Sequence, residues 1–181
     1  MKQIEYNGRI YYYRDGTFFD EFFLILEGND LRNVSKEYFK AIQWNNLTEE
    51  ELFENIKQMK YNGLLYETKK VIGHIFIERA NAVNLIHKLI PLYTSCCREL
   101  NQPEEAIKCA EELIPIYGAS SAIYTSLGAA YCDIKNYEKA KKCARIAYAK
   151  QKGGKGYKNE LSLLFLRIRK ETGENFFNDE D

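Results

Sequence analysis

Short runs of β-prone residues fill the first 20 positions of the chain. They cover residues 3–6, 9–13 and 17–19 and are rich in tyrosine, phenylalanine and isoleucine, which favour strands. Asn7-Gly8 and Asp15-Gly16 separate the runs, and both dipeptides tolerate the positive φ angles of tight hairpin turns. The pattern predicts a three-stranded antiparallel meander. Three short strands are not stable alone, so we expect this sheet to pack against helices.

The N-terminal aromatic residues allow two interpretations. Because side chains alternate between the two faces of a strand, about half of them should face inward and join the sheet to the helices. Alternatively, aromatic rings interleaved with Arg9 and Arg14 could stack on nucleic-acid bases. We favour the first interpretation. Residues 22–26 are expected to continue as an extended apolar strap until Gly28-Asn29-Asp30 ends it.

From Ser35 onward the apolar spacing is helical. A short helix is predicted for Ser35–Gln43, with Ser35 as its cap. Thr48 and Glu51 match a capping box at the start of the next helix, which Asn62-Gly63 should end, and another helix is predicted over residues 64–79. The expected buried faces of these two helices comprise Leu52, Ile56 and Met59, then Leu65, Thr68, Ile72, Ile75 and Phe76.

The rest of the chain shows four more helices and a terminal one. The four are predicted over residues 85–99, 103–116, 121–133 and 137–150. Lys152–Gly156 is a glycine-rich break without the spacing of a phosphate-binding loop. Tyr157–Lys170 is amphipathic, with one apolar face formed by Leu161, Leu164, Phe165 and Ile168. We expect this last helix to cap the exposed end of a helical stack.

Two of these helical segments nearly repeat each other at an offset of 34 residues. Residues 103–110 align with residues 137–144, and the pairs Glu104/Glu138, Ala106/Ala140, Lys108/Lys142, Cys109/Cys143 and Ala110/Ala144 are identical. The second copy also contains the pattern Tyr124-x-x-Leu127-Gly128-x-x-Tyr131. A period of 34 with this pattern resembles the tetratricopeptide repeat. The resemblance covers about residues 85–152, with degenerate flanking helices.

This resemblance implies a mainly α fold, a right-handed superhelix of helical hairpins, to which the small N-terminal antiparallel β-meander is added. Small residues should be buried where helices cross, and Gly128 should tolerate alanine but no large side chain. The expected segments are 1–30 (meander and apolar strap), 31–80 (helices with a degenerate first repeat), 81–152 (two tetratricopeptide-like repeats), 153–171 (capping helix) and 172–181 (acidic tail).

In tetratricopeptide proteins the first helix of each hairpin lines a concave face that binds a partner. The residues that the resemblance places there are Lys88, Ser95, Arg98, Glu99, Ala122, Thr125, Ala129, Cys132, Asp133 and, if the last helix continues the register, Asn159, Leu163 and Arg167. The family's chaperone-binding members clamp a terminal carboxylate with Lys and Asn. Those positions here hold Pro91, Ser95, Ser126 and Glu160, so that clamp is absent. The capping helix could also fill the groove.

Charge is distributed unevenly although the chain has 26 basic and 26 acidic residues. Residues 135–170 carry a net charge of +10. Lys139, Lys142 and Arg145 follow i, i+3, i+6 spacing on one helix and form a basic patch. Such a stripe is often a solvated face, but it could also attract an acidic protein or a phosphate backbone.

Candidate catalytic and metal-binding residues do not form a recognisable constellation. The five cysteines include no CxxC pair, and His74 and His87 are not at ligand spacing to any of them. We expect reduced packing cysteines and neither a metal nor a cofactor. The start of the chain lacks a signal-peptide apolar region, and no apolar run approaches about 18–20 residues. The sequence therefore predicts a cytoplasmic protein without a membrane span, and not an enzyme.

The function that these patterns favour is a non-catalytic adaptor or regulator that binds a protein or peptide. The alternative is a nucleic-acid-associated accessory protein that uses the basic C-terminal helices. Neither the partner's identity nor the oligomeric state can be read from the sequence.

Overall fold

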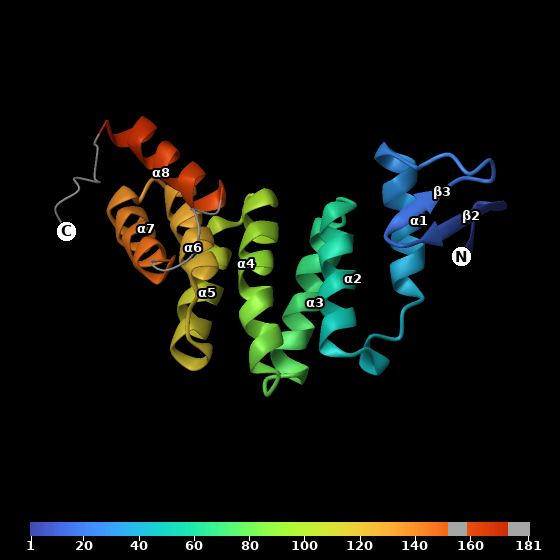
Figure 1. The fold of residues 1–181 in the computed structure, drawn as a ribbon, viewed down its shortest axis with the longest axis horizontal. Coiled ribbons are helices and arrows are strands. Elements are labelled where there is room, and N and C mark those ends of the chain that lie inside the picture. Colours follow the sequence, from blue (N-terminus) through green and yellow to red (C-terminus); the bar gives the residue numbers. More distant parts are fainter. Residues whose placement is uncertain (152–158, 174–181) are drawn as a thin grey trace. The chain divides into compact units, whose positions relative to one another are not determined.

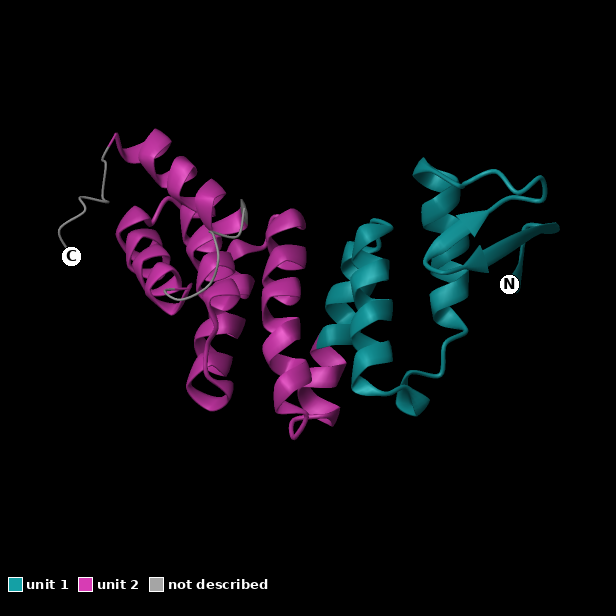
Figure 2. Cartoon of the chain, viewed as in Figure 1, with its two compact units in different colours: residues 1–72 teal, residues 73–181 magenta. Residues whose placement is uncertain are grey.

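The computed structural model describes residues 1–151 and 159–173, which are mainly helical (Figure 1). They form two compact units, residues 1–72 and 73–181 (Figure 2). The elements are β1 (Lys2–Tyr6), β2 (Arg9–Arg14), β3 (Thr17–Phe19), α1 (Gly28–Lys40), a 3₁₀ turn η1 (Trp44–Asn46), α2 (Glu49–Tyr61), α3 (Leu65–Glu78), α4 (Val83–Glu99), α5 (Pro103–Tyr117), α6 (Ser121–Asp133), α7 (Tyr137–Gln151) and α8 (Asn159–Thr172).

The first unit contains the predicted meander. Its strand order is β1-β2-β3, antiparallel throughout. Asn7 and Gly8 have φ angles of 51° and 73°, and Tyr6 pairs with Arg9 across them. Positive φ at both central residues defines the type I′ turn, whose twist matches that of the strands it joins. The prediction of a tight hairpin at this dipeptide is therefore confirmed.

The inner face of the sheet packs against α1, as expected. Phe18 is only 1% exposed, and its ring lies 5.5 Å from that of Tyr38 and 6.4 Å from that of Phe39. Val34 and Met59 belong to the same buried cluster. Aromatic residues of the inner face thus form the contact between the sheet and the helices.

The start of α1 differs from the prediction. The helix begins at Gly28 and not at Ser35, which lies buried in its middle and donates a hydrogen bond to the carbonyl of Arg32. Gly28 has a φ of 56° and allows the chain to enter the helix, and Asp30 lies in the first turn, where the helix dipole favours an acid. Gly28, Asn29 and Asp30 were expected only to end the apolar strap, but they form the first turn of α1.

The start of α2 follows the prediction. The Thr48 side chain accepts a hydrogen bond from the Glu51 amide, and the Glu51 carboxylate accepts one from the Thr48 amide at 2.9 Å. Hydrogen bonds from the Thr48 backbone and then its side chain lower the pKa of Glu51. Leu52, Ile56 and Met59 are buried as expected.

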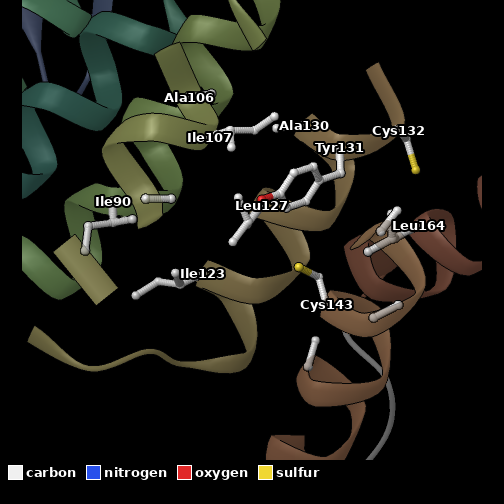
Figure 3. Packing of buried hydrophobic residues seen from close by; sticks show 14 of the residues in the cluster. Ile90, Ala106, Ile107, Ile123, Leu127, Ala130, Tyr131, Cys132, Cys143 and Leu164 are labelled. Atoms are coloured by element: carbon white, nitrogen blue, oxygen red, sulfur yellow. The ribbon is translucent and has the colours of Figure 1, made fainter. Parts of the chain in front are cut away.

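The second unit contains the helical hairpins of the repeat. The small residues expected at the helix crossings are fully buried: Ala106, Ala110, Ala140 and Ala144. Figure 3 shows Leu127 and Tyr131 of α6 between Ile107 of α5 and Cys143 of α7. Leu161, Leu164 and Ile168 of α8 join this core, which confirms the apolar face predicted for the last helix.

Three helix ends share one backbone geometry. Gly63, Asn101 and Lys135 have φ angles of 77°, 58° and 59°. At Lys135, the amide bonds to the Cys132 carbonyl and the next amide to that of Tyr131, which is the pairing of a Schellman motif. The same two bonds recur after Gly63 and Asn101. The three hairpins therefore turn in the same way, although only the first has glycine at this position.

Replacing Lys135 with glycine should stabilise the protein by about 0.5–1 kcal/mol, because a left-handed residue with a Cβ costs about 1–2 kcal/mol and glycine loses more backbone entropy on folding. Lys142→Gly, at an exposed position inside α7, is the matched control and should cost about 1 kcal/mol. Urea denaturation followed by circular dichroism measures both. Equal destabilisation by the two substitutions would contradict the prediction.

Candidate functional site

An ion cluster joins three helices of the second unit. Asp133, the last residue of α6, accepts a hydrogen bond at 2.6 Å from Nε of Arg98 in α4 and another at 2.6 Å from Nη1 of Arg167 in α8. Nη2 of Arg98 lies 3.4 Å from the other carboxylate oxygen. The side chains of Arg98, Asp133 and Arg167 are 26%, 23% and 38% exposed. All three were candidate contact residues, and the structure brings them together.

One carboxylate between two guanidinium groups leaves this cluster with a net positive charge. Each guanidinium has five N–H donors, and Asp133 accepts only some of them. Burial is the largest single influence on the pKa of Arg167 and would lower it, but the hydrogen bond and the charge of Asp133, with smaller contributions from Cys132 and Tyr137, together raise the pKa. The N–H groups that Asp133 does not engage can donate to a further anionic or carbonyl oxygen.

The neighbouring thiol of Cys132 has a raised pKa. Burial is the main cause, and the two arginines only partly offset it. Burial likewise raises the pKa of Cys109 to about 12 and of Cys143 to about 11. A raised pKa keeps a thiol protonated at neutral pH and lowers its nucleophilicity.

The other candidate contact residues differ in exposure. Lys88 and Glu99 are exposed, and the Ser95 hydroxyl donates to Glu99 at 2.9 Å. Ala129 is half-buried. Thr125 is buried, with its hydroxyl bonded to the Ser121 carbonyl, and so offers little surface to a partner. The remaining candidates are Ala122 and Cys132 (half-buried and buried), Leu163 (exposed) and Asn159, whose side chain lies outside the described residues.

The basic patch of α7 is divided between two environments. Lys139 lies 3.6 Å from Glu111 and 3.2 Å from the hydroxyl of Tyr131, which itself donates to Glu111. Lys142 and Arg145 are exposed. The first member of the patch therefore joins α7 to its neighbours, and two positive charges remain for a solvent or partner contact.

An exposed apolar loop follows β3 where the sequence predicted an extended strap. The Asp20 carboxylate accepts hydrogen bonds from the amides of Phe22 and Leu24 at 2.9 and 2.8 Å, which turns the chain. Phe22, Phe23, Leu24 and Ile25 are 75%, 57%, 65% and 65% exposed. The sequence signal for this turn was Asp20 itself, because Asp often bonds to backbone groups that follow it.

Residues 1–151 and 159–173 contain no group of three or more His, Cys, Asp or Glu side chains placed to hold a metal ion. None of their helices combines the length and the apolar character that crossing a membrane requires.

Comparisons with known proteins bear on the fold. No family model matches the chain, and no curated protein does. Among solved structures, the crystal structure of MamA protein matches with a TM-score of 0.52 and 15% sequence identity, over 80% of this chain and 84% of that one. This likeness shows a tetratricopeptide-like helical-repeat fold. It confirms the fold class predicted from the 34-residue period.

Proposed function

We propose that this chain is a non-catalytic adaptor or regulator that binds a segment of a partner protein along the face formed by α4, α6 and α8. The observation that carries the proposal is the cluster of Arg98, Asp133 and Arg167. It places one charged residue from each of the alternate helices α4, α6 and α8 side by side. Helices α4 and α6 are the first helices of their hairpins, and α8 is the capping helix.

The packing of α8 supports a face of α4, α6 and α8 that is open to a partner. Helix α8 contacts both α6 and α7, and α6 contacts both α4 and α5. The capping helix therefore packs like the first helix of another hairpin and extends the row of α4 and α6. Arg167 also lies 34 positions after Asp133, which is the register of the repeat.

The charge of the cluster favours an acidic side chain in the bound segment. Paired guanidinium groups bind carboxylates in a planar, two-bond geometry. Because Asp133 already neutralises one positive charge, a single Asp or Glu of the partner would balance the cluster. A segment with only basic residues would be repelled.

The test compares proteins captured from an extract of the source organism by immobilised variants. Arg167→Gln removes a charge from the cluster but leaves Asp133 paired with Arg98. Arg145→Gln, the matched control, makes the same change on α7. We expect the control to retain the partners of the parent protein and Arg167→Gln to lose at least about 80% of them, since truncating an arginine hot spot costs about 1–2 kcal/mol or more.

Ala129→Gln gives a second test by adding bulk to the same face without changing charge. It should also reduce capture, while circular dichroism confirms that the variant stays folded. If Ala129→Gln and Arg167→Gln both retain every partner, binding does not use this face and the proposal fails.

The alternative function, nucleic-acid association, depends on the exposed residues Lys142 and Arg145. The pairing of Lys139 with Glu111 weakens it. Binding to generic single- and double-stranded nucleic acid at about 50 mM salt tests it, because contacts to phosphates strengthen steeply as salt falls. We expect no binding. Binding that Lys139→Glu, Lys142→Glu and Arg145→Glu together abolish would support the alternative instead.

A further inference from the structure

The two outer edges of the N-terminal sheet differ. On the β3 side, the chain folds back after the loop, and the Leu26 amide donates to the Phe18 carbonyl at 2.9 Å. Ile25 forms a bridge with Phe19. The edge of β3 is therefore covered by the chain itself. Strand β1 lies at the other end of the sheet, and within residues 1–151 and 159–173 no segment pairs with its outer edge.

The register of the hairpin shows which groups β1 leaves unpaired. The residues that flank a two-residue turn form a hydrogen-bonded pair, and such pairs alternate along an antiparallel ladder. Tyr6 and Arg9 flank the turn, so Tyr6, Ile4 and Lys2 bond to β2. The amides and carbonyls of Gln3 and Glu5 point the other way. In the described part of the chain, no hydrogen bond joins these groups to another segment.

This free edge borders an open cleft of about 820 Å³ within the first unit. The opposite walls are the end of α1, the turn around η1 and the first half of α2. A volume of this size lies within the range of about 300–1,000 Å³ typical of ligand sites. An added strand would need only about 4.8 Å of space beside β1.

The walls of the cleft favour a positively charged occupant. Glu5, Glu37 and Glu51 line it, against Lys2, and Glu37 is also paired with Lys40 at 2.6 Å. The pKa of Glu51 is lowered, so its carboxylate stays ionised well below neutral pH. Glu49 and Glu50, which precede it at the start of α2, add to the negative charge on that side.

One wall already accommodates a cation. The Lys2 Nζ lies 5.4 Å from the centre of the Tyr38 ring and 3.3 Å from its hydroxyl oxygen. Burial raises the pKa of the adjacent Tyr13, so its phenol stays neutral. An aromatic wall beside carboxylates is a surface on which lysine and arginine side chains bind.

We propose that β1 binds an extended, lysine- or arginine-containing segment of a partner protein as a fourth strand of the sheet. Main-chain bonds to Gln3 and Glu5 hold the segment, and the glutamates of the cleft select its basic side chains, which is the strand-addition mode of peptide recognition. This site lies in the first unit. It is separate from the α4, α6 and α8 face and prefers the opposite charge.

The probe is a fluorescent heptapeptide of alternating lysine and valine, titrated against the full chain. We expect binding with a dissociation constant of about 1 mM or lower, with shifts of the Gln3 and Glu5 amide signals in NMR spectra. The same peptide with N-methylated backbone amides keeps its charge but cannot donate main-chain bonds. It should bind at least about tenfold more weakly.

Protein variants separate the contributions of main chain and charge. Gln3→Pro removes an outward amide, a change that edge strands tolerate. It should weaken binding about tenfold, whereas its control Gln3→Val should not.

Glu5→Lys should also weaken binding about tenfold because it reverses a charge in the cleft. Its matched control, Glu54→Lys on the exposed side of α2, should have little effect. Arg167→Gln should leave binding of the lysine–valine peptide unchanged. Failure of the strand-addition proposal can therefore be told apart from failure of the adaptor proposal.

Three outcomes would overturn the proposal. The first is no binding of the lysine–valine peptide at about 1 mM. The second is equal binding of the N-methylated peptide, which would reduce the effect to charge attraction. The third is a dimer in analytical ultracentrifugation that Gln3→Pro dissociates, because β1 would then pair with a second copy of this chain.

Discussion

Replacing Phe18 with alanine is expected to lower the free energy of unfolding of the first unit by about 3–5 kcal/mol. The ring is 1% exposed and contacts the rings of Tyr13, Tyr38 and Phe39, so its removal leaves a cavity where the sheet meets α1. A loss of this size is a large part of the about 5–15 kcal/mol that stabilises a typical domain. Fluorescence of Trp44, the single tryptophan, reports this unit because its ring stacks on Phe39 at 6.4 Å.

The control is Phe22→Ala, four residues further along the same segment. Phe22 is 75% exposed, so its removal should change stability by less than about 0.5 kcal/mol. The two substitutions delete the same atoms and differ only in burial. A cost above about 2 kcal/mol for Phe22→Ala would mean that the apolar loop is covered in solution.

Local signals made much of the fold predictable from the sequence. Asn7-Gly8 determines its turn because both residues tolerate positive φ. Thr48 and Glu51 determine the start of α2 because their spacing allows two reciprocal hydrogen bonds. The buried alanines, such as Ala106 and Ala140, were predictable because the repeat places small residues where helices cross. Each of these features depends on residues a few positions apart or on a fixed period.

The incorrect predictions lie where a local sequence rule competed with another interaction. Ser35 is a good helix cap, but Leu31, Val34 and Tyr38 follow helical spacing through it, and burying that face against the sheet extends α1 back to Gly28. The apolar run after Phe19 resembled a strand continuation. The Asp20 side chain instead captured two amides and turned the chain. Composition alone does not show which of two competing hydrogen-bond partners prevails.

The candidate sites were predictable in part. The repeat period placed Arg98 and Asp133 on the first helices of their hairpins, and Arg167 beside them if the capping helix continued the register. It did not predict their mutual pairing, which depends on side-chain conformation and on the packing of α8. The open edge of β1 was not predicted. An edge is open only if no distant segment covers it, and the sequence of the strand does not contain that information.

The structure places close neighbours around Gly128, where alanine was expected to be tolerated. A Cβ at this position would lie 2.8 Å from Cδ2 of Leu164 and 3.2 Å from Cβ of Cys143. Real Cβ atoms essentially never approach another heavy atom to below 3.0 Å. We therefore expect Gly128→Ala to cost about 1–3 kcal/mol by overpacking, measured by urea denaturation followed at 222 nm.

Gly73→Ala provides the matched control, because Gly73 is also helical and a Cβ there meets nothing within 4 Å. It should stabilise the protein by about 0.5–1 kcal/mol, the usual gain for this substitution in a helix. Leu164→Ala identifies the source of the strain at Gly128. By itself it should cost about 2–5 kcal/mol, but combined with Gly128→Ala the double variant should be more stable than the sum of the two losses predicts. Simple additivity would show that Cys143 on α7, and not the capping helix, limits the space at Gly128.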